Sequence, residues 1–420
     1  MIKQNPLILL QPVKKEMLGK LEERLKKIKD NLQDNTETEF KKCSNMHYAR
    51  WVILSRESFR DEPAFPIPVR LVFSSNYDGD EEKHLTELAT VLAKYIDDLY
   101  ECCEGYPEPA ARTTESRKNY LEKGIVKTSA FYNGAPGRTV NQIHEEESLR
   151  QYIWEFIKNN KWDGKKADDV HRAIRVEIDS KPEFEWTKQK AGVQGIKWFN
   201  LISYGLLFIV ALPFIIIWAL YLFIFHELRD VNQNLTLSQL DDNKVRKLKE
   251  VEDLFPQNQF TQVAVLKPGF VRSLNFRIWM LRTRVLANNV FVKGKLLNIP
   301  TIHFARWVLI DNNKHVLFFS NFDGNWQQYL SDFIDQSGWG LSGIFSNTVN
   351  FPKTKFMITG GAYDEEHFLA WSRSTQVPTQ VWYCPYPHLS IKNINNNTKI
   401  RNELRKNLNE EQAKIFLKRF

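Results

Sequence analysis

The sequence has few cysteines and none of the compact motifs that identify the common enzyme classes. Its four cysteines form no CxxC pair and show no metal-ligand spacing. Adjacent Cys102 and Cys103 would not readily bridge each other, so we expect reduced thiols and soluble parts that are cytoplasmic. No P-loop, GxGxxG, HExxH or Ser/His/Asp order is present. These absences leave nucleotide binding, zinc peptidase activity and serine hydrolysis without support.

Nucleic-acid binding has no motif to support it either, since the sequence contains no zinc finger, RNP box or KH-type GXXG loop. The formal net charge is +8 and the isoelectric point is about 9.0. A positive excess of this size fits an anionic membrane surface. We therefore expect membrane lipid, and not nucleic acid, as the partner of this charge.

One long segment lacks charged residues altogether. Residues 198–225 read WFNLISYGLLFIVALPFIIIWALYLFIF, and about 20 apolar residues suffice to cross a bilayer. The segment predicts membrane attachment, either as a single tilted helix kinked at Pro213 or as a hairpin that bends there. Basic residues flank it on both sides, so charge asymmetry does not decide between the two topologies.

The remainder of the chain repeats itself. HYARWV, from His47, corresponds to HFARWV, from His303, and SNYDG before Asp80 corresponds to SNFDG before Asn325. A third block, FYNGAPGRTVNQI from Phe131, corresponds to WYCPYPHLSIKNI. Three blocks in the same order indicate a duplication with the apolar segment inserted at the joint.

The periodicity within each half predicts strand–helix–strand–strand–helix–strand, the order of a ferredoxin-like unit in the α+β class. Such a sheet has helices on one face only, so two sheets can cover each other and close an α+β barrel. Pairing within one chain places both halves on one side of the membrane and favours the hairpin, whereas pairing between chains, as a homo-oligomer, allows either topology. We divide the chain into a first repeat (1–160), a charged linker (161–197), the membrane segment (198–226), a polar linker (227–259) and a second repeat (260–420).

The repeated residues include the first candidates for catalysis. Arg50 and Arg306 lie on strands, and Asp78 and Asp323 end the neighbouring strands. A buried arginine needs a partner, so these residues could be structural Arg–Asp pairs. Alternatively, the aspartates could shape the turn into the next helix, which Asp80 or Asn325 would then cap. The structural interpretation is favoured, because residues kept in both halves are those that the fold needs.

Positions at which the halves differ supply further candidates. Glycine and arginine in GAPGR suit an anion, with Arg138 as the ligand. His388 follows the proline-rich stretch YCPYP, and His367 lies in a predicted helix, so either could ligate a haem or a metal. The other differing residues are as follows: Cys102, Cys103, His144, His315, Trp326, Trp339, Cys384 and Tyr386.

The blocks TIHFARWVLID, LFFSNFDGNWQQYLSDFID and FYNGAPGRTVNQI resemble a bacterial membrane-anchored family whose function is not established. At the level of fold the chain is similar to the dimeric α+β barrel superfamily, which includes dye-decolorising peroxidases and chlorite dismutases. This resemblance implies a haem bound between helices and sheet. SNYDG and SNFDG share only Asp-Gly with the GxxDG motif of those peroxidases.

Two functions remain open from the sequence. The first is a membrane-anchored, peroxidase-like oxidoreductase that acts on a hydrophobic or lipid-derived substrate, with haem as the cofactor that the resemblance implies. The second is a non-catalytic lipid-binding or scaffolding module that recruits a partner enzyme to the membrane.

Overall fold

The computed structural model describes residues 2–33, 39–55, 58, 68–192, 195–291, 296 and 299–420. It is an α+β protein with two four-stranded antiparallel sheets and one long apolar helix. The first sheet has the strand order β1 (Gln4–Pro12), β3 (Arg70–Asp78), β2 (Met46–Leu54) and β10 (Val381–Tyr383). The second has the order β4 (Thr128–Asn133), β6 (Ile302–Ile310), β7 (His315–Asp323) and β5 (Gln257–Val265).

The two halves exchange their last strands. β10, from the second half, pairs with β2 of the first, and β4, from the first half, pairs with β6 of the second. The chain just before β4 still bonds to its own half, because Val126 N donates to Ile8 O at 2.9 Å. Likewise Val377 N donates to Thr261 O at 2.9 Å just before β10. In each case the chain just before the exchanged strand bonds to the sheet of its own half, and the strand itself forms an edge of the other sheet.

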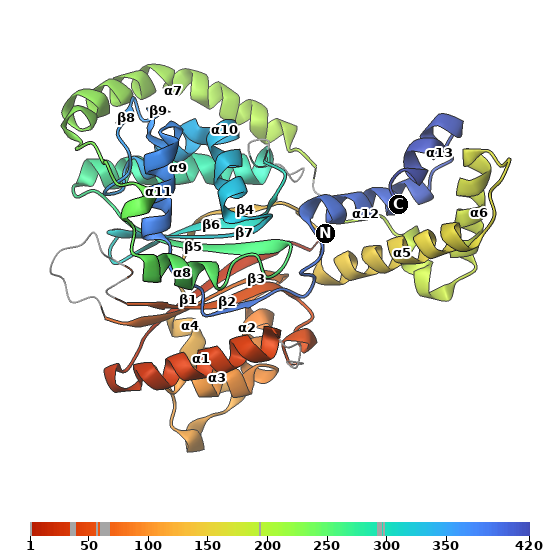
Figure 1. The fold of residues 1–420 in the computed structure, drawn as a ribbon, viewed down its shortest axis with the longest axis horizontal. Coiled ribbons are helices and arrows are strands. Elements are labelled where there is room, and N and C mark those ends of the chain that lie inside the picture. Colours follow the sequence, from red (N-terminus) through yellow and green to blue (C-terminus); the bar gives the residue numbers. More distant parts are fainter. Residues whose placement is uncertain are drawn as a thin grey trace.

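The sheets pack face to face, which Figure 1 shows as two stacked layers. Their inner faces bury β-branched and aromatic side chains, the residues that suit a strand covered on both sides. The cluster comprises Ile8, Val52, Leu54 and Val72 from the first sheet and Val263, Val308, Ile310, Leu317 and Phe319 from the second. This contact covers the sheet faces that the sequence predicts would be bare.

Helices cover the outer faces. The first sheet carries α1 (Leu18–Gln33), α2 (Glu81–Thr90), α3 (Ala93–Tyr100) and α4 (Thr114–Lys123). The second carries α9 (Phe270–Asn289), α10 (Trp326–Phe345) and α11 (Glu365–Thr375), with a small β8–β9 hairpin (Thr354–Lys355, Thr359–Gly360). The apolar stripe through Leu85, Leu88, Ile96 and Leu99 is buried as its spacing predicts, although the helix breaks at Leu92.

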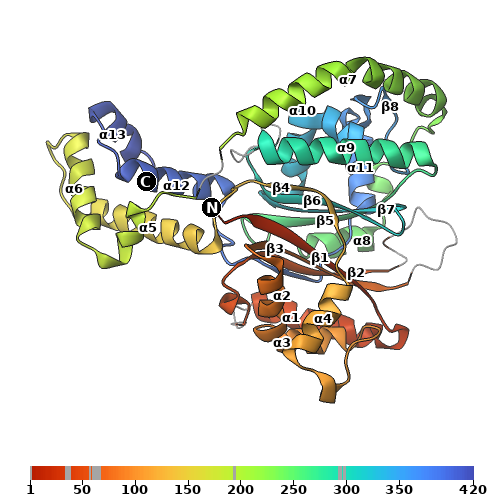
Figure 2. The same cartoon turned by 180° about the vertical axis from the view of Figure 1, so that it is seen from behind.

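Four helices form an arm that projects from the stacked sheets (Figure 2): α5 (Val140–Asn159), α6 (Ala167–Asp179), α12 (Ile391–Leu404) and α13 (Glu410–Leu417). The segment expected as a charged linker (161–197) contributes α6. Val170, Ile174 and Ile178 recur at helical spacing on α6 and pack with Leu149 and Phe416. The arm thus has a small core of its own.

The apolar segment is one continuous helix, α7 (Trp198–Phe225), with Pro213 inside it. The hairpin topology, which pairing within one chain favours, is therefore wrong. Among the described residues α7 is the one helix long and apolar enough to cross a membrane, judged by length and composition. It lies along the outside of the second half (Figure 1), and the following polar segment contains α8 (Asp242–Lys249).

Candidate functional site

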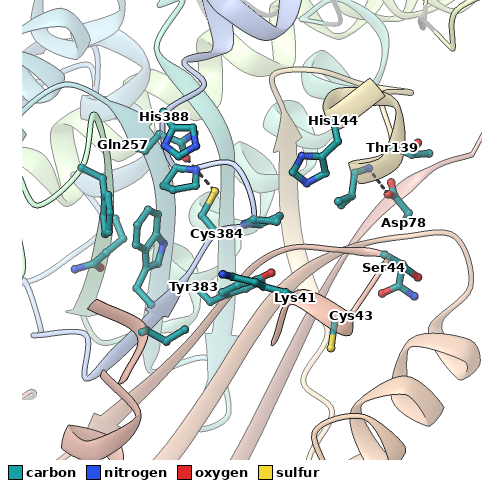
Figure 3. A pocket seen from close by; sticks show the side chains of 18 of the residues that line it. Lys41, Cys43, Ser44, Asp78, Thr139, His144, Gln257, Tyr383, Cys384 and His388 are labelled. Carbon is teal, nitrogen blue, oxygen red and sulfur yellow. Dashed lines mark hydrogen bonds between the residues drawn. The ribbon is translucent and has the colours of Figure 1, made fainter. Parts of the chain in front are cut away.

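A cavity of about 1290 Å³ opens where the two halves meet, and we name it the junction cavity. Six segments line it: the chain before β1, the end of α1 with the chain before β2, the end of β3 with the start of α2, the start of α5, the chain leading into β5, and the chain around β10. Figure 3 shows side chains from both halves pointing into it. The strand exchange brings these segments together, because β10 places residues 379–388 beside the first sheet.

The wall of the junction cavity combines cationic and apolar groups. The basic and imidazole side chains are Lys29, Lys41, Lys83, His144 and His388, against two carboxylates, Asp78 and Asp80. The apolar part includes Leu32, Val140, Leu254, Phe255, Trp382 and Tyr383. In the view of Figure 3, His144 comes from α5 and His388 from the segment after β10. An excess of cationic over anionic groups beside apolar surface suits an amphipathic anion.

Asp78 stands at the edge of the cavity in a dense set of hydrogen bonds. Its Oδ1 accepts from Gln4 Nε2 at 2.7 Å and lies 3.0 Å from His47 Nε2, and its Oδ2 accepts from Val140 N at 2.8 Å. Val140 begins α5, so the carboxylate also faces a helix N-terminus. Burial alone would raise the pKa of Asp78, but His47 and these hydrogen bonds outweigh it and hold the pKa below its usual value.

His47 links Asp78 to a tyrosine from the other half. Its Nδ1 lies 2.6 Å from the hydroxyl of Tyr386, which is buried. With the Nε2 proton directed at Asp78, Nδ1 accepts a hydrogen bond from the Tyr386 hydroxyl. His144, on the cavity wall, lies against the same tyrosine ring, with 6.1 Å between ring centroids. Burial lowers the pKa of His144, and the neighbouring imidazole groups of His47 and His388 lower it further.

The second half has a corresponding Asp–His pair, formed by Asp323 and His303. His303 Nε2 lies 2.7 Å from Asp323 Oδ1, and Ile391 N, at the start of α12, donates to Asp323 Oδ2 at 2.9 Å. The repeat aligns Tyr386 with Ala135, His144 with Asn395 and His388 with Gly137. Among the described residues, Tyr386 is hydrogen-bonded to the histidine of the first pair and His144 lies against that tyrosine, whereas the corresponding positions of the second half hold alanine and asparagine.

The expected Arg–Asp pairs are not formed, and this part of the prediction is wrong. Arg50 crosses the sheet interface and donates to Phe260 O and Ser320 O, both at 2.9 Å, and to Asn321 Oδ1. Arg306 crosses the other way, to Leu7 O at 3.0 Å and Ser75 O at 2.8 Å. Burial lowers the pKa of both guanidinium groups. Both arginines lie in the interior and not on the cavity wall.

The other predicted site residues are scattered. Arg138 is buried beside α12, where it donates to Asn395 Oδ1 at 2.8 Å, and it is not among the residues that line the cavity. His367 is partly exposed on α11 and bonds to Asp364 at 2.7 Å. His388 does line the cavity. The turn prediction is confirmed, since Asp80 and Asn325 cap α2 and α10.

The place that the fold resemblance assigns to haem is filled by side chains. Between the second sheet and its helices lie the buried rings of Trp307, Phe318, Phe345 and Trp371, with centroids 4.8 Å apart for Trp307–Phe318 and 5.1 Å for Phe345–Trp371. A second buried cluster fills the same layer of the first half. These residues do not fit a haem group there. Among the described residues, no group of three or more His, Cys, Asp or Glu side chains is arranged to hold a metal.

Sequence reasoning missed the two glutamines that organise the site. Gln4 bonds to Asp78 and receives Gly137 N at 2.7 Å, and Gln257 donates to Tyr386 O at 2.9 Å and Leu389 O at 2.6 Å. Each glutamine is the first residue of its strand, and Gln4 pairs with Asp78 as Gln257 pairs with Asp323. A glutamine at the same place in both halves was the signal that could have identified them. Comparison with protein-family models, with curated proteins and with solved structures found no match.

Proposed function

We propose that the protein is attached to a membrane through α7 and binds an amphipathic anion, such as a lipid-derived carboxylate or phosphate, in the junction cavity. The observation that carries the proposal is the wall of that cavity, which is lined both by Lys29, Lys41 and Lys83 and by apolar groups such as Phe255 and Trp382. Its volume exceeds the few hundred to about 1,000 Å³ typical of small-molecule sites. A long apolar chain with one anionic end matches this combination of size and lining.

The proposal includes a finer description of the fold. Two ferredoxin-like repeats would pair sheet to sheet as an α+β barrel. The exchanged strands β4 and β10 would close the barrel, because each connects one sheet to the other. The crossing hydrogen bonds from Val126 and Val377 support this description. Recruitment of a partner enzyme and self-association of the chain stay predictions.

The test is equilibrium binding of dodecyl phosphate and of oleate to the full chain in nanodiscs. We expect both to bind in competition with each other. Lys41→Gln combined with His388→Gln should weaken binding at least about tenfold, since a charge-assisted contact contributes about 1.5–3 kcal/mol. Lys165→Gln, a charge removed from an exposed loop of the arm, is the matched control. Equal affinities for all three proteins would overturn the proposal.

A blocking variant gives an independent check. Asn141 is exposed in the first turn of α5 and lines the cavity. Asn141→Trp should therefore occlude the cavity while leaving the core intact, and it should abolish binding of both probes. Unchanged binding would place the ligand elsewhere.

A catalytic function is the second candidate, and the chain Asp78–His47–Tyr386 favours it. Tyr386 forms a hydrogen bond with a histidine that a carboxylate holds, and acid–base catalysis uses hydrogen-bonded chains of this kind. His144, kept neutral by its lowered pKa, would serve as a base at the cavity wall. Turnover of a bound lipid-derived ligand that disappears in His144→Gln, with binding retained, would establish this function. Binding without turnover would leave the protein a binding module.

A further inference from the structure

Both ends of α7 are fixed to the same half of the molecule. Near its start, Asn200 Nδ2 donates to Asn289 Oδ1 of α9 at 2.9 Å. Toward its end, Trp218 Nε1 donates to Asn275 Oδ1 of α9 at 3.1 Å, and the Phe223 ring stacks on Phe356 at 4.3 Å. α7 thus runs antiparallel to α9, along its outer side (Figures 1 and 2).

The chain after α7 is held more firmly still. Glu227 is buried and receives hydrogen bonds from Thr354 Oγ1 and, at 2.8 Å, from Met357 N. Asp230 pairs with Lys267 at 2.8 Å and with Arg272 at 2.7 Å. Buried polar contacts of this kind are costly to break, so the end of α7 belongs to the folded second half.

The strand exchange limits how α7 can meet a bilayer. β4 precedes α7 in the chain and pairs with β6, which follows it, while β10 follows α7 and pairs with β2, which precedes it. Strands on opposite sides of a membrane cannot share backbone hydrogen bonds. A helix that crossed the bilayer once would separate these pairs, so the folded sheets require both ends of α7 to stay on one side.

The surroundings of α7 suit a lipid surface. α9 contains four arginines and no acidic residue. Three of the arginines, Arg277, Arg282 and Arg284, are exposed, and no carboxylate of the described residues forms an ion pair with them. Arg282 lies between the rings of Trp279 and Trp339, 4.6 and 4.4 Å from their centroids. Exposed apolar residues accompany them: Phe270, Ile278, Leu281, Phe356 and Ile358. Arginine, tryptophan and apolar side chains together are typical of helices at a membrane interface.

We propose that α7 lies in one leaflet of an anionic bilayer without crossing it, while the exposed arginines of α9 bind lipid phosphates. A helix of 28 residues is about 42 Å long, and most of its apolar side chains are exposed along that whole length, from Trp198 to Phe225. The inference rests on the membrane attachment in the proposed function, but not on ligand binding in the junction cavity.

Topology is the first test. The four native cysteines are buried, so exposed Ser180→Cys, before α7, and Ser238→Cys, after it, can be labelled with a membrane-impermeant maleimide in sealed vesicles. Both should react from the same side, with the unsubstituted protein as background. Reaction from opposite sides would overturn the proposal while leaving ligand binding intact. Protein that remains in the aqueous fraction would overturn membrane attachment itself.

Depth is the second test. Bimane attached at Ile202→Cys, Phe208→Cys or Phe214→Cys, all exposed positions of α7, is quenched by lipids brominated at known depths. One shallow depth for all three sites is expected, whereas a steady change of depth toward the bilayer centre would contradict the proposal.

Charge is the third test. Arg277→Gln with Arg284→Gln should reduce transfer from nonionic micelles to phosphatidylglycerol vesicles about fivefold per arginine at low salt. Arg172→Gln with Arg246→Gln removes the same charge from exposed sites on α6 and α8 and should have no such effect. Equal losses in both double variants would mean that α9 is not the surface that meets the lipid.

Discussion

The two halves of the molecule contain the same Asp–His pair in different surroundings. Asp78 and Asp323 each bond to a histidine and to the first backbone N–H of an arm helix. Only the first pair is extended to Tyr386 and stands at the cavity. The shared part fixes a strand end to a helix start in both halves, whereas the unshared part belongs to the candidate site alone.

The outer layers of the halves differ in a parallel way. The helices over the first sheet carry few exposed apolar side chains, whereas α9 and the β8–β9 hairpin expose Ile278, Leu281, Phe356 and Ile358 next to α7. Duplication supplied two similar frames. The first frame contributes the Asp–His pair at the cavity, and the second has the exposed apolar side chains near α7.

The largest expected effect concerns the interior arginines, where the halves should behave alike. Arg50→Met and Arg306→Met each leave several buried carbonyl acceptors across the interface without their donor. Each should lower the free energy of unfolding by about 3–5 kcal/mol, measured by denaturant titration in detergent. A loss below about 1 kcal/mol in either variant would contradict the symmetric role.

The aspartates should come next. Asp78→Asn removes a carboxylate that accepts three hydrogen bonds and should cost about 2 kcal/mol at pH 7. Because the folded pKa of Asp78 lies below its unfolded value of about 3.9, its contribution is present above that pH and is lost as pH falls through the folded pKa. The stability difference between Asp78→Asn and the unsubstituted protein should therefore shrink in acid. A difference that stays constant down to pH 2 would be the contrary result.

Tyrosine 386 tests the asymmetry directly. Tyr386→Phe leaves His47 Nδ1 without its 2.6 Å partner and should cost about 1 kcal/mol. In double-mutant cycles it should couple to Asp78→Asn through His47 and be additive with Asp323→Asn. Equal coupling to both aspartates would remove the distinction between the two sites.

The smallest effect should come from His367. Its hydrogen bond to Asp364 is a surface pair on one helix, so His367→Ala should change the unfolding free energy by less than about 0.5 kcal/mol. When both proteins are expressed with added haem, the absorption spectrum of the His367→Ala variant should match that of the unsubstituted protein. A Soret band lost in this variant would restore the ligand role that the sequence suggested.

Much of the architecture could be predicted because it depends on local order. The duplicated blocks, the α+β class, the capping residues Asp80 and Asn325 and the apolar helix all follow from spacing and composition along the chain. The candidate site could be predicted only in part. The sequence identifies Asp78, His144, His388 and Tyr386 as candidates, but it does not predict that they lie close together.

What the tertiary structure decided is which segments meet. The sequence by itself determined that each sheet would have one apolar face without helices, which must be buried, and that an apolar segment would join the halves. It did not determine that the last strands exchange, because a strand's apolar pattern is satisfied equally by its own sheet or by its copy's. That exchange brings Tyr386 to His47 and pairs strands that precede α7 in the chain with strands that follow it. The packing of the two sheets turns Arg50 and Arg306 toward backbone carbonyls instead of aspartates.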